Sequence, residues 1–240
     1  MHSSLKLILM MFVSLFYVLE AAAETVNVSW VGELKNVMQN DDRKSRVCLA
    51  DLEKRNLYAL GPAENLDGEI TVLDGWPSIS HVDAKGGSSV DHLLATKAPT
   101  LVYTNVEQWQ DFAIPITIQS AQELESFIAA AAKKAGLNIE RPFPFLLKGH
   151  FAEVDFHILR GSDASGVRVF GGDRVPFVEK NVQGTVLGFF SKHHQGIFTH
   201  KDSFVHIHFV SESDLKAGHV ENLRFVATAN MQLKLPTANF

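Results

Sequence analysis

The sequence predicts an α+β protein built mainly on antiparallel sheets, and three observations support this fold class. Segments rich in β-branched and aromatic residues recur along the chain, bounded by Gly and Asp turn residues. One strong helical pattern interrupts them near the middle of the chain. The order is therefore strands, a helix and strands again, which is not the alternation typical of parallel βαβ units.

The first 23 residues are predicted to be a signal peptide. Lys6 supplies a positive charge, Leu7 to Leu19 is almost uninterruptedly apolar, and Ala21-Ala22-Ala23 supplies the small residues that a signal peptidase recognises. Because the apolar run is shorter than the roughly 20 residues of a membrane-spanning helix, a retained anchor is the weaker alternative. We therefore expect residues 24–240 to be exported to the periplasm or the extracellular space, without membrane contact after leader removal.

The composition of the chain limits the classes of partner that we expect it to bind. The formal net charge is −5 and basic blocks are absent, which argues against nucleic acid as a partner. Cys48 is the single cysteine, so an internal disulfide is excluded. The sequence does not fix the oligomeric state, and a homodimer is one state that it allows.

Strand patterns lie on both sides of the helix. Glu69 to Leu73 is rich in β-branched residues and lies between the turn dipeptides Asp67-Gly68 and Asp74-Gly75. Further strands are expected over residues 113–119, 145–159, 184–190, 204–210 and 224–235.

The helix is predicted over residues 120–135. Ser120 and Glu123 form a capping box, and Leu124, Ile128 and Ala131 follow at helical spacing. We expect this helix to join two β-rich halves, at about 24–119 and 142–240. A second helix is predicted near residues 51–58.

A group of histidines near the C-terminus predicts a metal site. His206 and His208 alternate along one strand, so their side chains share one face. A polar turn follows, and His219 begins the next strand, which could fold back as a hairpin beside them. Three histidines leave a coordination position open, as in catalytic zinc sites. A His-x-His pair also occurs without a metal, so the residues alone leave both interpretations open.

Glu69 is the candidate acidic group. At the start of a strand it could be a solvated strand end, or it could be a general acid or base near the metal. Spacing along the chain does not decide between these two roles.

Two separated motifs resemble the α-acetolactate decarboxylase family. Asn65 to Gly75, with the sequence NLDGEITVLDG, resembles the family's segment around its essential glutamate. Val205 to Glu212, followed by Ala217-Gly218-His219-Val220, resembles its zinc segment. The resemblance covers about residues 57–236 and implies two β-rich halves packed into one unit.

The resemblance also implies a reaction, the zinc-dependent decarboxylation of 2-acetolactate to acetoin. His206, His208 and His219 would bind Zn²⁺, which would chelate substrate oxygens and stabilise the charge that forms as CO2 leaves. Glu69 would then protonate the carbon. The partner would thus be a small 2-hydroxy-3-keto acid.

Two departures from the family pattern concern substrate binding. His157 occupies the position where the resemblance expects an arginine, and the chain carries no acidic residue after Glu221, where the family has a second carboxylate. Either His157 replaces the arginine in binding the substrate carboxylate, or another cation such as Arg160 or Arg168 reaches the site. Two further functions remain open: a degenerate relative that binds zinc and a ligand without turnover, and a zinc hydrolase.

Overall fold

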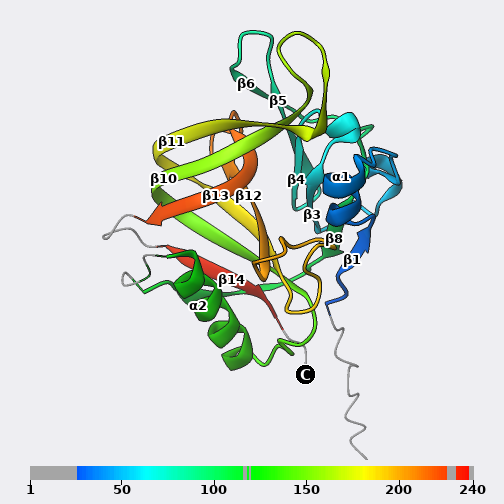
Figure 1. Ribbon diagram of the computed structural model, residues 1–240. Coiled ribbons are helices and arrows are strands. Elements are labelled where there is room, and N and C mark those ends of the chain that lie inside the picture. The colour runs from blue at the N-terminus through cyan, green and yellow to red at the C-terminus, as the bar shows by residue number, and fades with distance from the viewer. Residues whose placement is uncertain (1–25, 116–117, 119, 226–230, 238–240) are drawn as a thin grey trace, which may run out of the picture.

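The computed structural model describes residues 26–115, 118, 120–225 and 231–237 (Figure 1). The expected signal peptide, residues 1–23, lies outside the described residues. The described chain forms two large antiparallel sheets and two α-helices, which confirms the predicted fold class. Within these ranges, no helix is both long and apolar enough to cross a membrane.

The first sheet has the strand order β1-β8-β3-β4-β5-β6. Its strands are β1 (Ser29–Val31), β3 (Leu57–Pro62), β4 (Glu69–Leu73), β5 (Trp76–Val82), β6 (Ser88–Asp91) and β8 (Leu101–Asn105). Successive residues of β3 pack into different apolar clusters, Leu57 and Ala59 into one and Tyr58 and Leu60 into the other. Because apolar groups cover both faces, β3 is buried along its whole length, and so is most of β4. A short pair, β2 (Val47–Cys48) and β7 (Lys97–Ala98), stands apart from this sheet.

The second sheet closes on itself. Its order is β11-β12-β13-β10-β14-β9, and β11 also pairs with β10. The strands are β9 (Trp109–Ala113), β10 (Phe143–Ser162), β11 (Arg168–Phe190), β12 (Val205–Ser211), β13 (Ala217–Phe225) and β14 (Gln232–Pro236). Phe151 and Phe156 each pack against Phe209 in its core. β9 precedes the helix in sequence yet pairs with β14 here.

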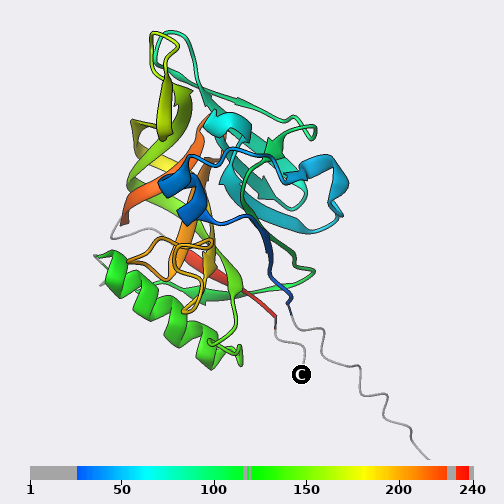
Figure 2. The same cartoon turned by 45° about the vertical axis from the view of Figure 1, so that its right-hand side comes forward.

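The helix α2 (Ala121–Lys134) lies alongside β14 in both ribbon views (Figures 1 and 2). Its predicted N-cap is confirmed, since Oγ of Ser120 accepts a hydrogen bond of 3.2 Å from the backbone N–H of Glu123. Ile128 and Ala132 are fully buried against the core of the second sheet. This burial explains the helical spacing of apolar residues in the sequence.

One predicted element was wrong, and another is described only in part. Residues 51–58 form no α-helix: a 3₁₀ turn (Leu49–Asp51) is followed by irregular chain and then by β3. Asn56 adopts a left-handed φ of 57°, and Asn105 donates hydrogen bonds to the carbonyls of Glu53 and Arg55, which a helix would have used itself. The strand expected over 113–119 is tested only in part, because residues 116–117 and 119 lie outside the described residues. β9 ends at Ala113, and the described residues 114 and 115 belong to no strand, as expected for Pro115, which has no N–H for the ladder.

The helix α1 (Leu34–Asn40) lies over the junction between the sheets. The N–H groups of Leu34 and Lys35 donate to the carbonyls of Ile197 and Gly196, each at 2.8 Å. Val37 packs with Leu66 and Leu159 in a small apolar cluster. The backbone hydrogen bonds and the apolar packing of Val37 together hold α1 beside the loop between β11 and β12.

Candidate metal centre and active site

Strand register brings three imidazoles together. His206 and His208 alternate on β12, and the antiparallel β12–β13 hairpin pairs His208 directly with His219. Nε2 of His206 lies 3.1 Å from Nδ1 of His219, and Nε2 of His208 lies 3.3 Å from the same atom. All three side chains are buried, between 0% and 6% exposed. The hairpin expected from the sequence is thus present and brings the three rings together.

These nitrogens fit a tetrahedral metal ion. Zn–N bonds of about 2.0–2.1 Å in tetrahedral geometry place two ligand nitrogens roughly 3.3 Å apart. Burial lowers the pKa of all three imidazoles, that of His208 to about 3, so they are neutral ligands at pH 7. Three neutral imidazole nitrogens that face one another cannot all form hydrogen bonds with one another, because each is either a donor or an acceptor. One cation, in contrast, accepts the lone pairs of all three. Thr71, from β4, lies 3.2 Å from Nδ1 of His208, so that ring can keep its proton on Nδ1 and direct Nε2 inward.

Glu69 reaches this centre from the first sheet. It is the first residue of β4 and is only 2% exposed. Its Oε2 lies 3.7 Å from Nε2 of His208, and its Oε1 lies 3.7 Å from Nε2 of His157. Burial raises the pKa of Glu69 to about 8, although the backbone N–H of Leu159 and the charge of Arg174 act in the opposite direction. A solvated strand end is therefore excluded, and Glu69 holds its proton at neutral pH.

His157 lies between two carboxyl groups. It is buried on β10, and its register partner on β13 is His219. Nδ1 of His157 hydrogen-bonds to Oε1 of Glu221 at 2.7 Å, while its Nε2 faces Glu69. The hydrogen bond from His157 holds the pKa of Glu221 below its usual range. His157, His219 and Glu221 form a second group with metal-ligand spacing, which shares His219 with the first.

Glu69, His157, His206 and His219 line one cavity. Two further side chains that were not predicted from the sequence, Arg174 and His200, line it as well. Arg174 on β11 pairs with Leu159 on β10, and both line the cavity. His200, from the loop between β11 and β12, places its Nε2 2.9 Å from Nε2 of His219. The cations considered from the sequence are engaged elsewhere, because Arg160 binds Asp173 and Arg168 binds Asp41.

The cavity has a volume of about 300 Å³ and a mixed lining. Its polar and titratable side chains are Glu69, His157, Arg174, His200, His206 and His219. Its apolar side chains include Leu34, Val37 and Met38 of α1, together with Pro62 and Leu159. Such a cavity suits a small ligand that carries both anionic and short apolar groups.

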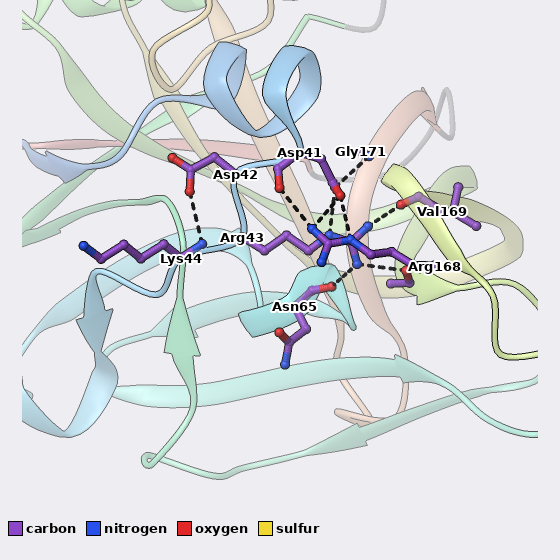
Figure 3. Close-up of polar contacts among 9 residues, drawn as sticks. Asp41, Asp42, Arg43, Lys44, Asn65, Arg168, Val169 and Gly171 are labelled. Carbon is purple, nitrogen blue, oxygen red and sulfur yellow. Dashed lines mark hydrogen bonds and ion pairs between the residues drawn. The ribbon is translucent and has the colours of Figure 1, made fainter.

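A network of ion pairs and hydrogen bonds fixes the C-terminal end of α1, the helix that supplies apolar lining of the cavity (Figure 3). Asp41, the C-cap residue of α1, accepts hydrogen bonds from Nε of Arg43 at 2.8 Å and from Nε of Arg168 at 2.7 Å. Arg43 also donates to the carbonyls of Asn65, Gly161 and Val169. The network therefore joins α1 to β10, to β11 and to the turn that precedes β4.

Known proteins share both the family signature and the fold. A family model described as alpha-acetolactate decarboxylase matches residues 34–238. The α-acetolactate decarboxylase of Bacillus subtilis strain 168 superposes with a TM-score of 0.67 at 17% identity, covering 88% of this chain and 84% of that chain. A Staphylococcus aureus protein of unknown function, described as similar to alpha-acetolactate decarboxylase, gives a TM-score of 0.67 at 16% identity, with 87% and 84% coverage. No curated protein matched by sequence.

Proposed function

Because the chain belongs to the α-acetolactate decarboxylase family, we propose that it is a zinc-dependent carboxy-lyase that converts 2-acetolactate to acetoin and CO2. One observation carries this proposal: a cluster of three facing imidazole nitrogens, from His206, His208 and His219, borders a cavity that is also lined by the carboxyl group of Glu69 and by Arg174. A small, anionic 2-hydroxy-3-keto acid needs these three kinds of group.

His206, His208 and His219 are proposed to hold the zinc ion. Their neutral state, their spacing and the outer contact of His208 with Thr71 all support this assignment. A bound zinc ion would supply a Lewis acid for the negative charge that develops on the substrate oxygens as CO2 leaves.

Glu69 is proposed to be the general acid. Loss of CO2 leaves an electron pair on the carbon that carried the carboxylate, and this carbon must gain one proton to become acetoin. Glu69 lies beside the histidine cluster, and in the metal-free site burial raises its pKa to about 8, which favours the protonated form that a general acid needs. Each turnover consumes one proton, which solvent must return to Glu69.

Arg174 is proposed to bind the substrate carboxylate. Its guanidinium is always charged and can donate two parallel hydrogen bonds to a carboxylate. His157 was the sequence-based candidate for this task, but its Nδ1 is engaged by Glu221 and only Nε2 faces Glu69. These contacts support a division in which Arg174 binds the anion and His157 orients groups around Glu69.

The experiment that tests this function is an acetoin assay with the purified mature chain, zinc and 2-acetolactate. Acetoin and CO2 should form in equal amounts. The histidine at position 157, where the resemblance expects arginine, favours one alternative, a relative that binds zinc and a small ligand without turnover. Stoichiometric zinc without acetoin would support that alternative.

We also propose that the protein is exported. The charged and apolar leader with its Ala21-Ala22-Ala23 segment supports removal of residues 1–23. Mass spectrometry of protein recovered from its native host should find an N-terminus at or within two residues of Glu24. Intact Met1 in a membrane fraction would contradict export by a cleaved leader.

A further inference from the structure

The three proposed zinc ligands do not use the same ring nitrogen. His206 and His208 direct Nε2 at the centre, whereas His219 directs Nδ1 there. The remaining nitrogen of His219, Nε2, therefore points away from the centre and towards the loop between β11 and β12. His200 meets it there, with its own Nε2 at 2.9 Å.

This contact has a defined direction when a metal occupies the centre. A neutral imidazole that ligates through Nδ1 must carry its hydrogen on Nε2. Nε2–H of His219 is then the donor, so Nε2 of His200 must be the acceptor and His200 must carry its hydrogen on Nδ1. The hydrogen bond thus couples the tautomers of the two rings.

The loop that carries His200 is held on several sides. Its Gly196 and Ile197 carbonyls accept hydrogen bonds from α1, and Phe198 and Thr199 are buried. Oγ of Ser203 donates to Glu125 of α2. His200 is therefore presented from a well-anchored segment, not from a free loop tip.

We infer that His200 is a positioning residue of the metal centre: by accepting the hydrogen bond from His219, it keeps the Nδ1 lone pair of His219 directed at the metal. This inference rests on the proposed metal site. His200 has the same relation to His219 that Thr71 has to His208, since each contacts the ring nitrogen that does not face the centre. His200 binds no substrate in this role and acts through His219.

An alternative arrangement has a second metal ion beside the first. His219 would bridge the two ions, and His157 and Glu221 would complete the ligands of the second. Arg174 argues against it, because its Nη1 lies 3.8 Å from Oε1 of Glu221 and would stand beside the added positive charge. The inference therefore predicts one tightly bound metal ion, with His200 outside its coordination sphere.

The test compares metal affinity in three variants of the mature chain. His200→Leu removes the acceptor, and His200→Gln replaces it with an amide oxygen of similar reach. His193→Leu alters a neighbouring histidine of the same loop, whose Nε2 binds Glu140 away from the centre. Zn²⁺ dissociation constants are measured by competition with a chromogenic chelator, and the melting temperature of each metal-free variant reports its folding.

We expect His200→Leu to weaken Zn²⁺ binding by about 10- to 100-fold, His200→Gln to recover most of that loss, and His193→Leu to match the wild type. An unchanged dissociation constant in folded His200→Leu would overturn the inference. So would two tightly bound equivalents of Zn²⁺ in the wild type, or a loss in His200→Gln as large as that in His200→Leu. If His200→Leu does not fold, His200→Ala, which also removes the acceptor, takes its place in the comparison with His200→Gln.

Failure of the proposed function is separable from failure of this inference. A wild-type chain that binds no Zn²⁺ would contradict the metal centre itself. A chain that binds Zn²⁺ with the expected variant pattern but forms no acetoin would leave the role of His200 intact and contradict only the decarboxylase assignment.

Discussion

Arg174 on β11 pairs with Leu159 on β10, and the two side chains line the cavity that also contains Glu69. Side chains two residues apart on a strand share a face, so His157 lies on the same side of β10 as Leu159. A guanidinium therefore enters the cavity from the strand next to the one that carries His157. This relationship places at the cavity a cation that the linear sequence does not reveal, and we propose that it binds the substrate carboxylate.

Replacing Arg174 with Gln should weaken substrate binding more than turnover. A charged hydrogen bond is worth about 1.5–3 kcal/mol, so KM for 2-acetolactate should rise roughly 10- to 100-fold. Steady-state kinetics on the zinc-loaded enzyme measure this effect. Arg160→Gln is the matched control, because Arg160 binds Asp173 and its loss should leave KM unchanged. Equal KM values in both variants would remove Arg174 from the site.

Replacing Glu69 with Gln should abolish most turnover and leave the fold intact. Burial raises the pKa of this carboxyl group to about 8 in the metal-free site, so a neutral amide of the same shape should fit in its place. We expect unchanged zinc content and melting temperature, with kcat lowered by about 100-fold or more. A variant that keeps wild-type kcat would show that another group delivers the proton.

Replacing His157 with Leu tests whether His157 orients the groups around Glu69 or instead binds the metal. The change removes the 2.7 Å hydrogen bond to Glu221 and the ring between Glu221 and Glu69. Because His157 is proposed to lie outside the zinc ligands, Zn²⁺ should remain stoichiometric while kcat/KM falls about tenfold or more. Loss of zinc in a folded His157→Leu chain would instead assign the ion to the group formed by His157, His219 and Glu221.

Asp41 should make the stability of the metal-free protein depend on pH. Burial alone would raise the pKa of Asp41, but hydrogen bonds from Arg43, the N–H of Gly171 and Arg168 lower it from 3.8 to about 2. A folded pKa below the unfolded value means that Asp41 stabilises the fold above about pH 4, and that this contribution is lost as pH falls towards 2.

Urea denaturation of wild type and Asp41→Asn at pH 7, 4 and 2.5 tests this account of the network in Figure 3. Wild type should be the more stable at pH 7, and the difference should narrow steadily at the two lower pH values. A difference that stays constant with pH would show that the Asp41 carboxylate charge does not contribute.

The sequence predicted the features that depend on local patterns. Alternation along one strand and a short polar turn brought His206, His208 and His219 together, because these distances span only a few residues. The capping box at Ser120 was local in the same way.

The features that the sequence did not predict depend on pairing between distant segments. Arg174 enters the cavity only through the register of the long β10–β11 hairpin, and no pattern near Arg174 records that register. His200 lies on a loop without periodicity, and its contact with His219 depends on how that loop folds. The helix expected over residues 51–58 does not form. Asn105, far along the chain, instead donates hydrogen bonds to the backbone carbonyls of Glu53 and Arg55, which a helix would have used itself.

The most direct test of the whole account is a zinc titration of the metal-depleted mature chain, with acetoin formation from 2-acetolactate measured at each addition. The account predicts no acetoin without metal, a linear rise to a plateau at one equivalent of Zn²⁺, and no rise in His206→Ala, His208→Ala or His219→Ala. One tightly bound equivalent of Zn²⁺ with no acetoin at any point, or acetoin formation by the metal-depleted chain, would contradict it.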